Sequence, residues 1–358
     1  MPASIVAQGN SAASAGMPPI RQRQGTTAAE LLVDARAAAY PLLARVIGGL
    51  PDPLRRMAGY HFGWWDRLGN PASAASGKAL RSALVFAAAA ACGGPRDAAQ
   101  PAAAAVELLH NFTLLHDDVI DGDRTRHGRE TVWSVWGMPD AVLLGDVLHI
   151  AAAGLLATDL PAAISCRAVT YLEAASVELC AGQHEDCAFE SREQVLPEEY
   201  LRMATGKTGS LMGVSCALGA LCAEAEPTTI ALFDTFGREL GLAFQIVDDL
   251  LGIWGDPMIT GKPAGSDLSG RKQSLPVVYA LCSDTEAGAE LADLYRSDAP
   301  MSQDDVVRAA ELIEAAGARA SAQQLADDHL TKALEVLPDQ SAASDLITLA
   351  QFSVHRDR

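Results

Sequence analysis

The chain has 358 residues, of which 49% are apolar, and its 27 basic and 45 acidic residues give a net charge of −18. This composition can fill a sizeable core, which excludes a disordered chain and a small disulfide scaffold. The acidic charge and the lack of a Lys/Arg block argue against a protein that binds nucleic acid through its phosphates. The seven cysteines include no CxxC pair, which predicts reduced thiols in the cytoplasm rather than disulfides or a zinc site.

Residues 1–28 predict a disordered N-terminal tail. They are rich in Gly, Ser, Pro and Gln, and only Arg21 and Arg23 are charged. The segment also lacks the apolar stretch of a signal peptide. No Gly/Ser linker or solenoid repeat divides residues 29–358, so we expect them to form one domain.

Beyond the tail, apolar residues recur at intervals of three and four, which is the period of an amphipathic helix. Proline and glycine separate these segments, and none has the alternating pattern of a strand. The longest uncharged run, 208–223, is shorter than the roughly 18 residues that cross a bilayer, so we expect no membrane span. The sequence therefore predicts one all-α domain. In chain order, the predicted helices are 29–50, 80–91, 102–120, 141–158, 162–187, 197–223, 228–253, 274–282, 302–316 and 320–336.

A first group of carboxylates ends the predicted helix 102–120. Asp117 and Asp121 are one helical turn apart and share a face, whereas Asp118 points about 100° away from Asp117. Three carboxylates within one turn repel one another strongly unless cations lie between them. The group therefore indicates a cation site.

A second pair, Asp248 and Asp249, ends the apolar helix 228–253. Oxygen ligands on two facing helices favour Mg²⁺, which is commonly shared with the phosphates of a substrate. Either group alone could be an acidic helix end in water. The occurrence of both, each after an apolar helical face, favours the metal site.

Several isolated basic residues occur near these groups in the sequence despite the acidic total charge. Such residues are suited to hold a polyphosphate beside a metal ion, although each is also typical of a protein surface. The glycine-rich loop 252–267 is not a Walker sequence, so nucleotide binding is not implied. The basic residues are Lys78, Arg81, Arg124, Arg126, Lys207, Lys262, Arg271 and Lys272.

Five segments, in this order and spacing, resemble the trans-polyprenyl diphosphate synthases, the family of farnesyl and geranylgeranyl diphosphate synthases. They are GKALR (77–81), LLHDDVID (114–121), GKTGSL (206–211), LAFQIVDD (242–249) and GKPAGSDL (261–268). The resemblance covers about residues 29–355 and is strongest to an actinobacterial branch, with AGYHFGWWD at 58–66 and IWGDP at 253–257. It implies an all-α orthogonal prenyltransferase helix bundle around a central cavity, usually as a homodimer.

The resemblance also implies roles for individual residues. Asp117 and Asp121 are expected to bind two Mg²⁺ ions and Asp248 a third, and Asp118 and Asp249 belong to the same candidate metal motifs. All three ions would be bridged by the diphosphate of an allylic substrate. Further contacts to that diphosphate are expected from Arg126, Lys207, Gln245 and Lys262, and the pocket for isopentenyl diphosphate from Lys78, Arg81 and His110.

The implied reaction begins when metal ions and bases draw charge onto the leaving diphosphate, so that the allylic C–O bond ionises. The isopentenyl double bond then attacks the carbocation, toward which Thr208 and Gln245 would direct dipoles. A cavity poor in water is required because water would quench the cation. Gln183 and Asp186 match a further family motif near the cavity, for which a structural role and an active-site role stay open.

Three positions depart from the family pattern. His127 stands where a second arginine usually follows Arg126, so a titratable imidazole replaces one expected contact to isopentenyl diphosphate. Gly252 stands where the second motif often has its third aspartate. Ser82 replaces a proline that often follows the Leu-Arg pair, and we expect this change to matter little.

The expected product length depends on the helix that precedes the first motif. Each helical turn of 5.4 Å is close to the length of one isoprene unit, so residues one turn before Asp117 would limit the growing chain. Thr113 is small and Phe112 is bulky, an arrangement that in the family resembles enzymes stopping at geranylgeranyl diphosphate (C20). Farnesyl diphosphate (C15) is the second expectation, because the facing segment 141–148 could close the channel one turn earlier.

Other functions and partners stay open. The rival is a non-elongating relative on the same fold, either a terpene-cyclase-like lyase or a weakly active scaffold subunit. Lys78 and Arg81 favour elongation because a cyclase has no use for a second diphosphate pocket, whereas His127 favours the rival. Relatives in this branch are sometimes cargo of encapsulin-type shells, and the tail 1–28 is the candidate docking segment.

Overall fold

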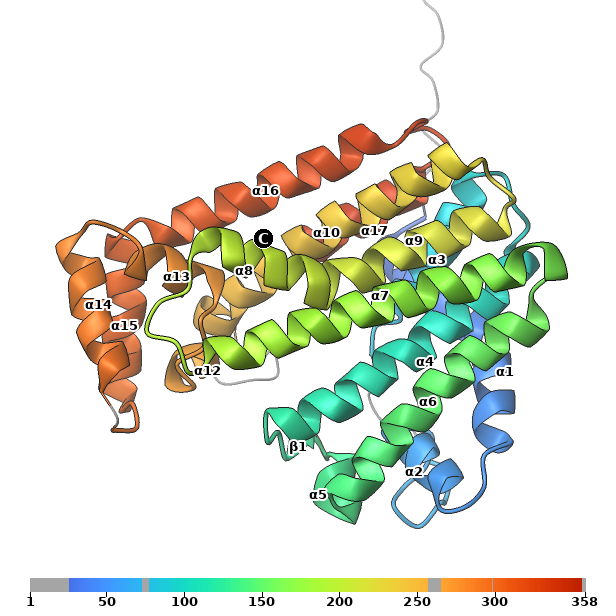
Figure 1. The fold of residues 1–358 in the computed structure, drawn as a ribbon, viewed down its shortest axis with the longest axis horizontal. Helices are drawn as coiled ribbons and strands as arrows, with labels where there is room; N and C mark the ends of the chain where they lie inside the picture. The colour runs from blue at the N-terminus through green and yellow to red at the C-terminus, as the bar shows by residue number, and fades with distance from the viewer. Residues whose placement is uncertain (1–25, 73–76, 257–264, 298, 356–358) are drawn as a thin grey trace, which may run out of the picture.

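The computed structural model describes residues 26–72, 77–256, 265–297 and 299–355. Lys262 and most of the expected tail, residues 1–25, lie outside these ranges. Within them the chain is a bundle of long helices, in which α16 runs along one edge and α14 and α15 form a pair at one end (Figure 1).

The long helices agree with the segments predicted from apolar periodicity, mostly to within a few residues. The prediction of an all-α fold is confirmed, and the predicted helix 197–223 is divided in two by a π-helical turn. The elements corresponding to predicted helices are α1 (Ala28–Gly48), α3 (Leu80–Ala91), α4 (Arg96–Ile120), α6 (Met138–Asp159), α7 (Ala162–Phe189), α8 (Pro197–Ala204), η1 (Thr205–Gly209), α9 (Ser210–Cys222), α10 (Pro227–Trp254), α13 (Leu275–Leu281), α15 (Gln303–Ala315) and α16 (Ala318–Val336).

Five helices and a small hairpin were not predicted. Most of these segments are short or polar, so their apolar spacing is a weak signal. The expectation that the chain contains no strand is wrong at one place, where strands β1 and β2 pair in an antiparallel hairpin. The additional elements are α2 (Leu54–His61), β1 (Thr125–Arg126), β2 (Arg129–Glu130), α5 (Val132–Trp136), α12 (Ser266–Ser269), α14 (Glu286–Arg296) and α17 (Ser344–Val354).

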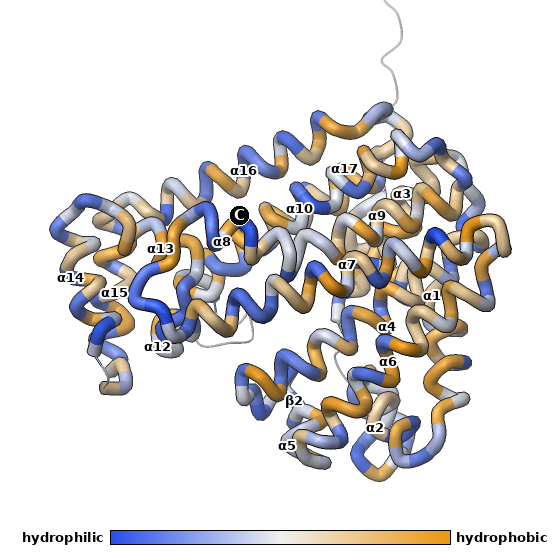
Figure 2. Tube along the Cα trace, in the orientation of Figure 1, coloured by the Kyte–Doolittle hydropathy of each residue, from blue (hydrophilic) through white to orange (hydrophobic). Residues whose placement is uncertain are grey.

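Helix α9 lies at the centre of the bundle, and all of its residues are buried. It packs closely on α10 because glycines face each other: a Cβ at Gly237 would lie 2.7 Å from the Cα of Gly213, and a Cβ at Gly241 would lie 2.7 Å from the Cα of Gly209 in η1. Figure 2 shows apolar residues along α9 and α3, and alternating polar and apolar turns along α16. This packing fixes α10, which carries the second aspartate motif, against the turn η1.

Helix α6 is the one helix in the described ranges that is long and apolar enough, by length and composition alone, to cross a membrane. It packs instead between α4 and α7 as a helix of the bundle (Figure 1). Three apolar side chains on α6 and α7 nevertheless face outward: Leu143, Ile150 and Val177 are 56%, 70% and 70% exposed. All seven cysteines are unpaired thiols, as the sequence predicts.

Candidate active site

Helix α4 carries the first aspartate motif at its C-terminal end, and the helical period separates its carboxylates. Asp117 and Asp121 lie one turn apart, and the Asp121 N–H donates to the Asp117 carbonyl at 2.8 Å. Asp118 is only 1% exposed and accepts a hydrogen bond from Arg126 Nε at 2.7 Å. Burial raises the pKa of Asp118 to about 6, against the opposing effect of Arg126. The motif thus directs Asp118 into a protein ion pair, away from the other two carboxylates.

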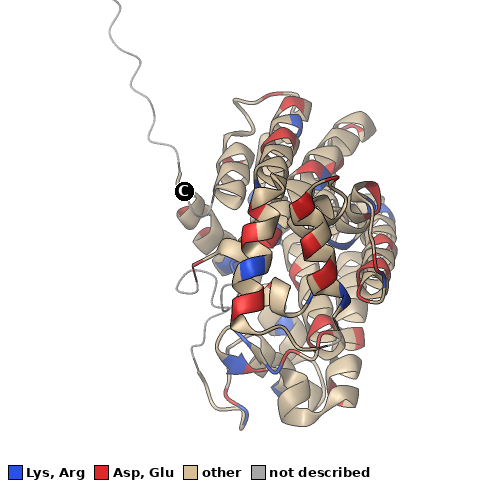
Figure 3. Ribbon diagram, turned by 90° about the vertical axis from the view of Figure 1, so that its left-hand side faces the viewer, with Lys and Arg blue, Asp and Glu red and all other residues tan. Residues whose placement is uncertain are grey.

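Charged side chains from other segments of the chain gather around Asp117 and Asp121. Lys207 Nζ donates to Asp186 Oδ2 at 2.5 Å, and Lys272 Nζ lies 3.9 Å from Asp121 Oδ2. Burial raises the pKa of Asp117, which Lys207 opposes and Asp121 reinforces. Figure 3 looks onto the end of the bundle formed by α14 and α15, and shows acidic and basic residues along the helices nearest the viewer. We call these five residues the aspartate cluster, and Asp186 therefore belongs to the active-site region.

The second motif, at the end of α10, also divides into two environments. Asp249 is buried and accepts hydrogen bonds from Tyr200 Oη at 2.5 Å, the Leu275 N–H at 2.8 Å and Gln245 Nε2 at 3.0 Å. Burial raises the pKa of Asp249 to about 7, although the Tyr200 hydroxyl favours its ionised form. Asp248, by contrast, lines an open cavity. Asp249 therefore holds α10 against α8 and α13, and leaves Asp248 as the carboxylate of this motif that faces the cavity.

The π-helical turn η1 directs two adjacent side chains to different partners. Lys207 reaches Asp186 in the aspartate cluster, whereas Thr208 Oγ1 donates to Gln245 Oε1 at 2.6 Å. Single π turns inside α-helices often occur at functional sites. Since Gln245 in turn donates to Asp249, the turn is linked by hydrogen bonds to the second motif.

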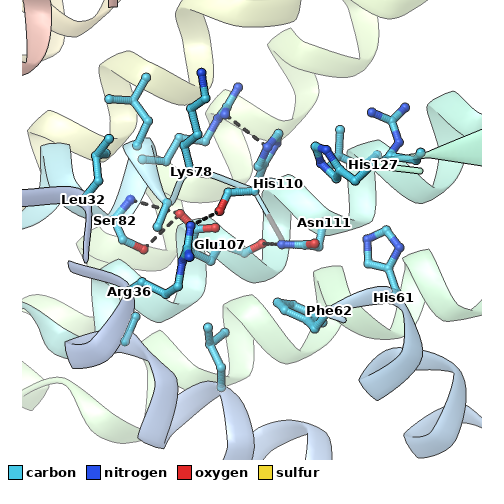
Figure 4. A pocket seen from close by; sticks show the side chains of 18 of the residues that line it. Leu32, Arg36, His61, Phe62, Lys78, Ser82, Glu107, His110, Asn111 and His127 are labelled. Atoms are coloured by element: carbon cyan, nitrogen blue, oxygen red, sulfur yellow. Dashed lines mark hydrogen bonds between the residues drawn. The ribbon is translucent and has the colours of Figure 1, made fainter. Parts of the chain in front are cut away.

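A cavity of about 430 Å³ adjoins the aspartate cluster along α4, where the helical period places His110 on the face that carries Asp117 and Asp121; it is bordered further by α1, α2, α3, the hairpin, α10 and α17. Its polar lining is mostly cationic or imidazole, with a few carboxylates among these groups. We call it the cationic cavity (Figure 4). Basic and imidazole side chains that line it are Arg36, His61, Lys78, Arg81, His110, Arg126, His127 and Arg129.

Arg81 and His110 connect the cationic cavity with both aspartate motifs. Arg81 Nη1 lies 3.1 Å from His110 Nε2. Burial lowers the pKa of the Arg81 guanidinium, while the carboxylates of Asp117 and Asp248 oppose that shift. The three predicted residues of the isopentenyl diphosphate pocket, Lys78 included, therefore meet in one cavity within electrostatic reach of the two motifs.

His127 occupies the tip of the β1–β2 hairpin. Arg126 pairs with Arg129, so the loop between them has two residues, and both His127 and Gly128 have positive φ. This is the geometry of a type I′ hairpin turn, and histidine is among the residues enriched at positive φ. Burial and the neighbouring Arg126 lower the pKa of His127. The residue that departs from the family pattern thus supplies a neutral imidazole to the cavity.

Sequence reasoning missed several polar residues that line the cationic cavity, three of them in or beside the hairpin or on α4. His61 comes from α2, Asn111 from α4 and Arg129 from β2. Arg129 also donates from Nη1 to the Tyr60 carbonyl, at 2.9 Å, and so joins the hairpin to α2. His61 lies in the family-like segment AGYHFGWWD, which could have pointed to it, but neither α2 nor the hairpin was predicted.

The glycine in the second motif makes room for another carboxylate. A Cβ at Gly252 would lie only 2.0 Å from Asp267 Oδ2. The space left by the missing third aspartate is therefore filled by Asp267, from the GKPAGSDL segment. Lys262, in the same segment, lies outside the described residues.

The two expected chain-length residues do not line the cationic cavity. Phe112 is buried and stacks on His149 of α6, with ring centroids 5.1 Å apart and planes at 21°. His149 in turn lies 2.9 Å from Glu173 of α7. Thr113 is also buried, and its hydroxyl donates to the His110 carbonyl at 2.8 Å.

The aspartate cluster fits hard divalent cations that are shared with a phosphate ligand. Its candidate donors are all carboxylate oxygens, the ligands that Mg²⁺ prefers, and a cation would favour the ionised form of Asp117. In the described part of the chain, no three Asp, Glu, His or Cys side chains already converge on one metal position. Oxygens of a bound ligand would therefore have to complete the coordination, as is common for Mg²⁺.

Comparisons with known proteins agree with this site. The polyprenyl synthetase family model matches residues 64–313. The chain is 53% identical to geranylgeranyl diphosphate synthase of Mycobacterium tuberculosis over 327 residues, which cover 91% of this chain and 93% of that protein. It is 43% identical to (2E,6E)-farnesyl diphosphate synthase of Mycobacterium bovis, and the match covers 88% of this chain and 90% of that protein.

A solved structure has the same overall fold. It is geranylgeranyl pyrophosphate synthase from Corynebacterium glutamicum, complexed with isoprenyl diphosphate and magnesium. The similarity has a TM-score of 0.81 at 25% identity, and covers 93% of this chain and all of that one.

Proposed function

The chain belongs to the polyprenyl synthetase family and is a prenyltransferase, and we propose that it condenses isopentenyl diphosphate with an allylic diphosphate in a head-to-tail, Mg²⁺-dependent reaction. The observation that carries this proposal is the opposite chemistry of two sites around α4. The aspartate cluster suits a metal-bound allylic diphosphate, and the cationic cavity suits the diphosphate of a second substrate. Two adjacent diphosphate sites are what elongation requires.

Bound magnesium would supply Lewis-acid stabilisation of the departing diphosphate. Asp117 and Asp121 would hold two ions and Asp248 a third, as the family resemblance implies. Lys207 would exchange part of its ion pair with Asp186 for contacts to the same diphosphate. In the cationic cavity, Lys78, Arg81 and His110 would orient isopentenyl diphosphate so that its double bond faces the ionising allylic carbon.

The remaining candidate site residues have protein partners that support positioning roles. Asp118 would hold Arg126 at the cavity wall through its 2.7 Å bond. Asp249 would fix Gln245, whose carbonyl oxygen already accepts from Thr208. We therefore assign direct metal contacts to Asp117, Asp121 and Asp248, and the orientation of the two motifs to Asp118 and Asp249.

The arrangement around Phe112 supports C20 as the main product. Its ring fills the space between α4 and α6 one turn before the first motif, and stacking on His149 holds it there. The identity of 53% to a geranylgeranyl diphosphate synthase, against 43% to a farnesyl diphosphate synthase, favours the same length. C15 remains the second candidate.

Purified protein with Mg²⁺, isopentenyl diphosphate and each allylic primer, with products resolved by length, tests the reaction. We expect C20 to dominate and EDTA to abolish turnover. Phe112→Ala should extend products beyond C20, and Thr113→Phe should shorten them to C15. No condensation with any primer would reject elongation and favour the non-elongating alternative. Unchanged lengths in both variants would mean that other residues form the end of the channel.

The outward-facing apolar residues of α6 and α7 support a homodimer. Leu143, Ile150 and Val177 are large apolar side chains left exposed, as residues of a protein interface are in a free subunit. We place the enzyme in the cytoplasm because all its thiols are unpaired. Docking of residues 1–28 to an encapsulin-type shell remains a proposal based on composition and family resemblance.

A further inference from the structure

His61 is a cavity residue to which neither the sequence motifs nor the proposed mechanism gives a role. It is the last residue of α2 and lines the cationic cavity next to the hairpin. In Figure 4 its ring lies beside His127, on the opposite side of the pocket from Leu32 and Arg36. Its Nε2 atom is buried and has no hydrogen-bond partner among the residues that the structure describes.

An unpartnered buried nitrogen is uncommon in a folded protein, because burial removes it from water without replacing the lost hydrogen bond. Three other buried polar atoms of cavity residues share this state: Arg81 Nε, His110 Nδ1 and Asp118 Oδ2. Three of these four atoms are nitrogens of basic or imidazole groups. The concentration of these three nitrogens around one cavity indicates that a ligand with several hydrogen-bond acceptors binds there.

The surroundings of His61 favour an anionic ligand over an apolar one. The Arg126 and His127 side chains approach its ring closely enough to disfavour an added positive charge. Burial is the largest effect and, with these two side chains, lowers the pKa of His61 to about 3, although a hydrogen bond with Asn111 opposes the shift. The imidazole is therefore neutral near pH 7, and in the tautomer that carries its proton on Nε2 it can donate one N–H without bringing another charge into the cavity.

We propose that His61 donates a hydrogen bond from Nε2 to the diphosphate of isopentenyl diphosphate, as a specificity contact contributed by α2. This assignment rests on the proposed function, which places that substrate in the cationic cavity. His61 would approach the anion from the hairpin side, whereas Lys78, Arg81 and His110 approach from α3 and α4. No bond is made or broken at His61, so its contribution is to binding and orientation alone.

The test is calorimetric binding of isopentenyl diphosphate to the full chain, without an allylic substrate. His61→Phe keeps a flat ring and removes the donor, and we expect the dissociation constant to rise about tenfold or more, as for a lost hydrogen bond to a charged group. His61→Gln restores an N–H near the position of Nε2, and should recover most of the affinity. His184→Phe, at an exposed position on α7, is the matched control and should bind as the wild type does.

Steady-state kinetics give a second readout, which would not change if the role of His61 were merely structural. His61→Phe should raise the KM for isopentenyl diphosphate about tenfold and change the KM for the allylic substrate by less than twofold. In ¹⁵N-histidine spectra of the wild type, the Nε2–H signal of His61 should shift when isopentenyl diphosphate is added. That spectrum keeps the proposal falsifiable if His61→Phe fails to fold.

The outcomes separate this assignment from the function on which it rests. Normal wild-type binding, with equal affinity in His61→Phe or with no shift of the His61 signal, would overturn the role of His61 alone. A wild type that binds no isopentenyl diphosphate would overturn the proposed function, and the His61 assignment with it.

Discussion

The aspartate cluster and the cationic cavity differ in what burial does to their ionisable groups. In the aspartate cluster, burial raises the pKa of Asp117. In the cationic cavity, burial lowers the pKa of His110 and of His61. Each region therefore disfavours its own charge until a ligand of the opposite sign arrives: a metal ion in the aspartate cluster and a diphosphate in the cationic cavity. The cation site and the anion site thus adjoin along one face of α4, and Asp117 acts directly on Arg81 of the cavity.

The largest expected effect tests the cation side. Asp117→Ala or Asp248→Ala removes a proposed metal ligand, and should reduce turnover by about two to three orders of magnitude or more. Circular dichroism should remain that of a folded helical protein. Asp97→Ala removes an exposed carboxylate at the opposite end of α4, and should retain full activity. Full activity of both motif variants in Mg²⁺ would reject the assignment of Asp117 and Asp248 as metal ligands.

An intermediate effect concerns the stability of the anion side. The pKa of His61 is about 3 in the folded chain and about 6.5 when unfolded, so below pH 6.5 the unfolded state binds a proton that the folded state does not. The stability contributed by neutral His61 is therefore present above pH 6.5, and is lost as pH falls toward 3. Relative to His61→Phe, the wild type should lose about 2 kcal/mol between pH 7.5 and pH 5.

Urea unfolding of both proteins at the two pH values measures this difference. The comparison between proteins matters because raised carboxyl pKa values, such as that of Asp249, act in the opposite direction and cancel in the subtraction. An identical pH dependence of wild type and His61→Phe would show that His61 is protonated in the folded chain.

The smallest expected effect concerns the hairpin tip. His127→Arg places a permanent charge in the cavity, and should lower the KM for isopentenyl diphosphate by about threefold to tenfold, with little change for the allylic primer. The gain is limited because arginine is less suited than histidine to the positive φ of this position. His127→Asn keeps the turn but adds no charge, and should not lower either KM. Equal effects of His127→Arg on both substrates would contradict its place in the cavity.

The sequence predicted the long helices and the residues at their ends, because both depend on local patterns. The periodicity of 102–120 and 228–253 located α4 and α10, and the motifs at their ends place Asp117 and Asp248 near Arg81. The helical period also predicted that Asp118 would leave the face shared by Asp117 and Asp121. What it could not predict was that Arg126 would bind Asp118, because that contact depends on the hairpin.

The residues that the sequence did not reveal come from short elements or from contacts between distant segments. His61 lies on an eight-residue helix whose position depends on packing rather than on apolar spacing. The hairpin has strands of two residues, so only the positive φ at His127 and Gly128 defines it. Asp267 fills the space beside Gly252, from a segment fifteen residues later. The pattern of one helix does not show that a carboxylate from a later segment occupies the space beside it.

The π-helical turn η1 also limits how the chain can change its length. Removing one residue just beyond the turn, with η1 itself kept, would rotate everything further along the chain by about 100° relative to α8. Every residue of α9 is buried, so a rotated α9 could not present a polar face to solvent. A surface loop can accommodate a deletion by bending. Here the rotation would instead be carried into the centre of the bundle. The number of residues between Lys207 and the core is thus fixed as strictly as their identity.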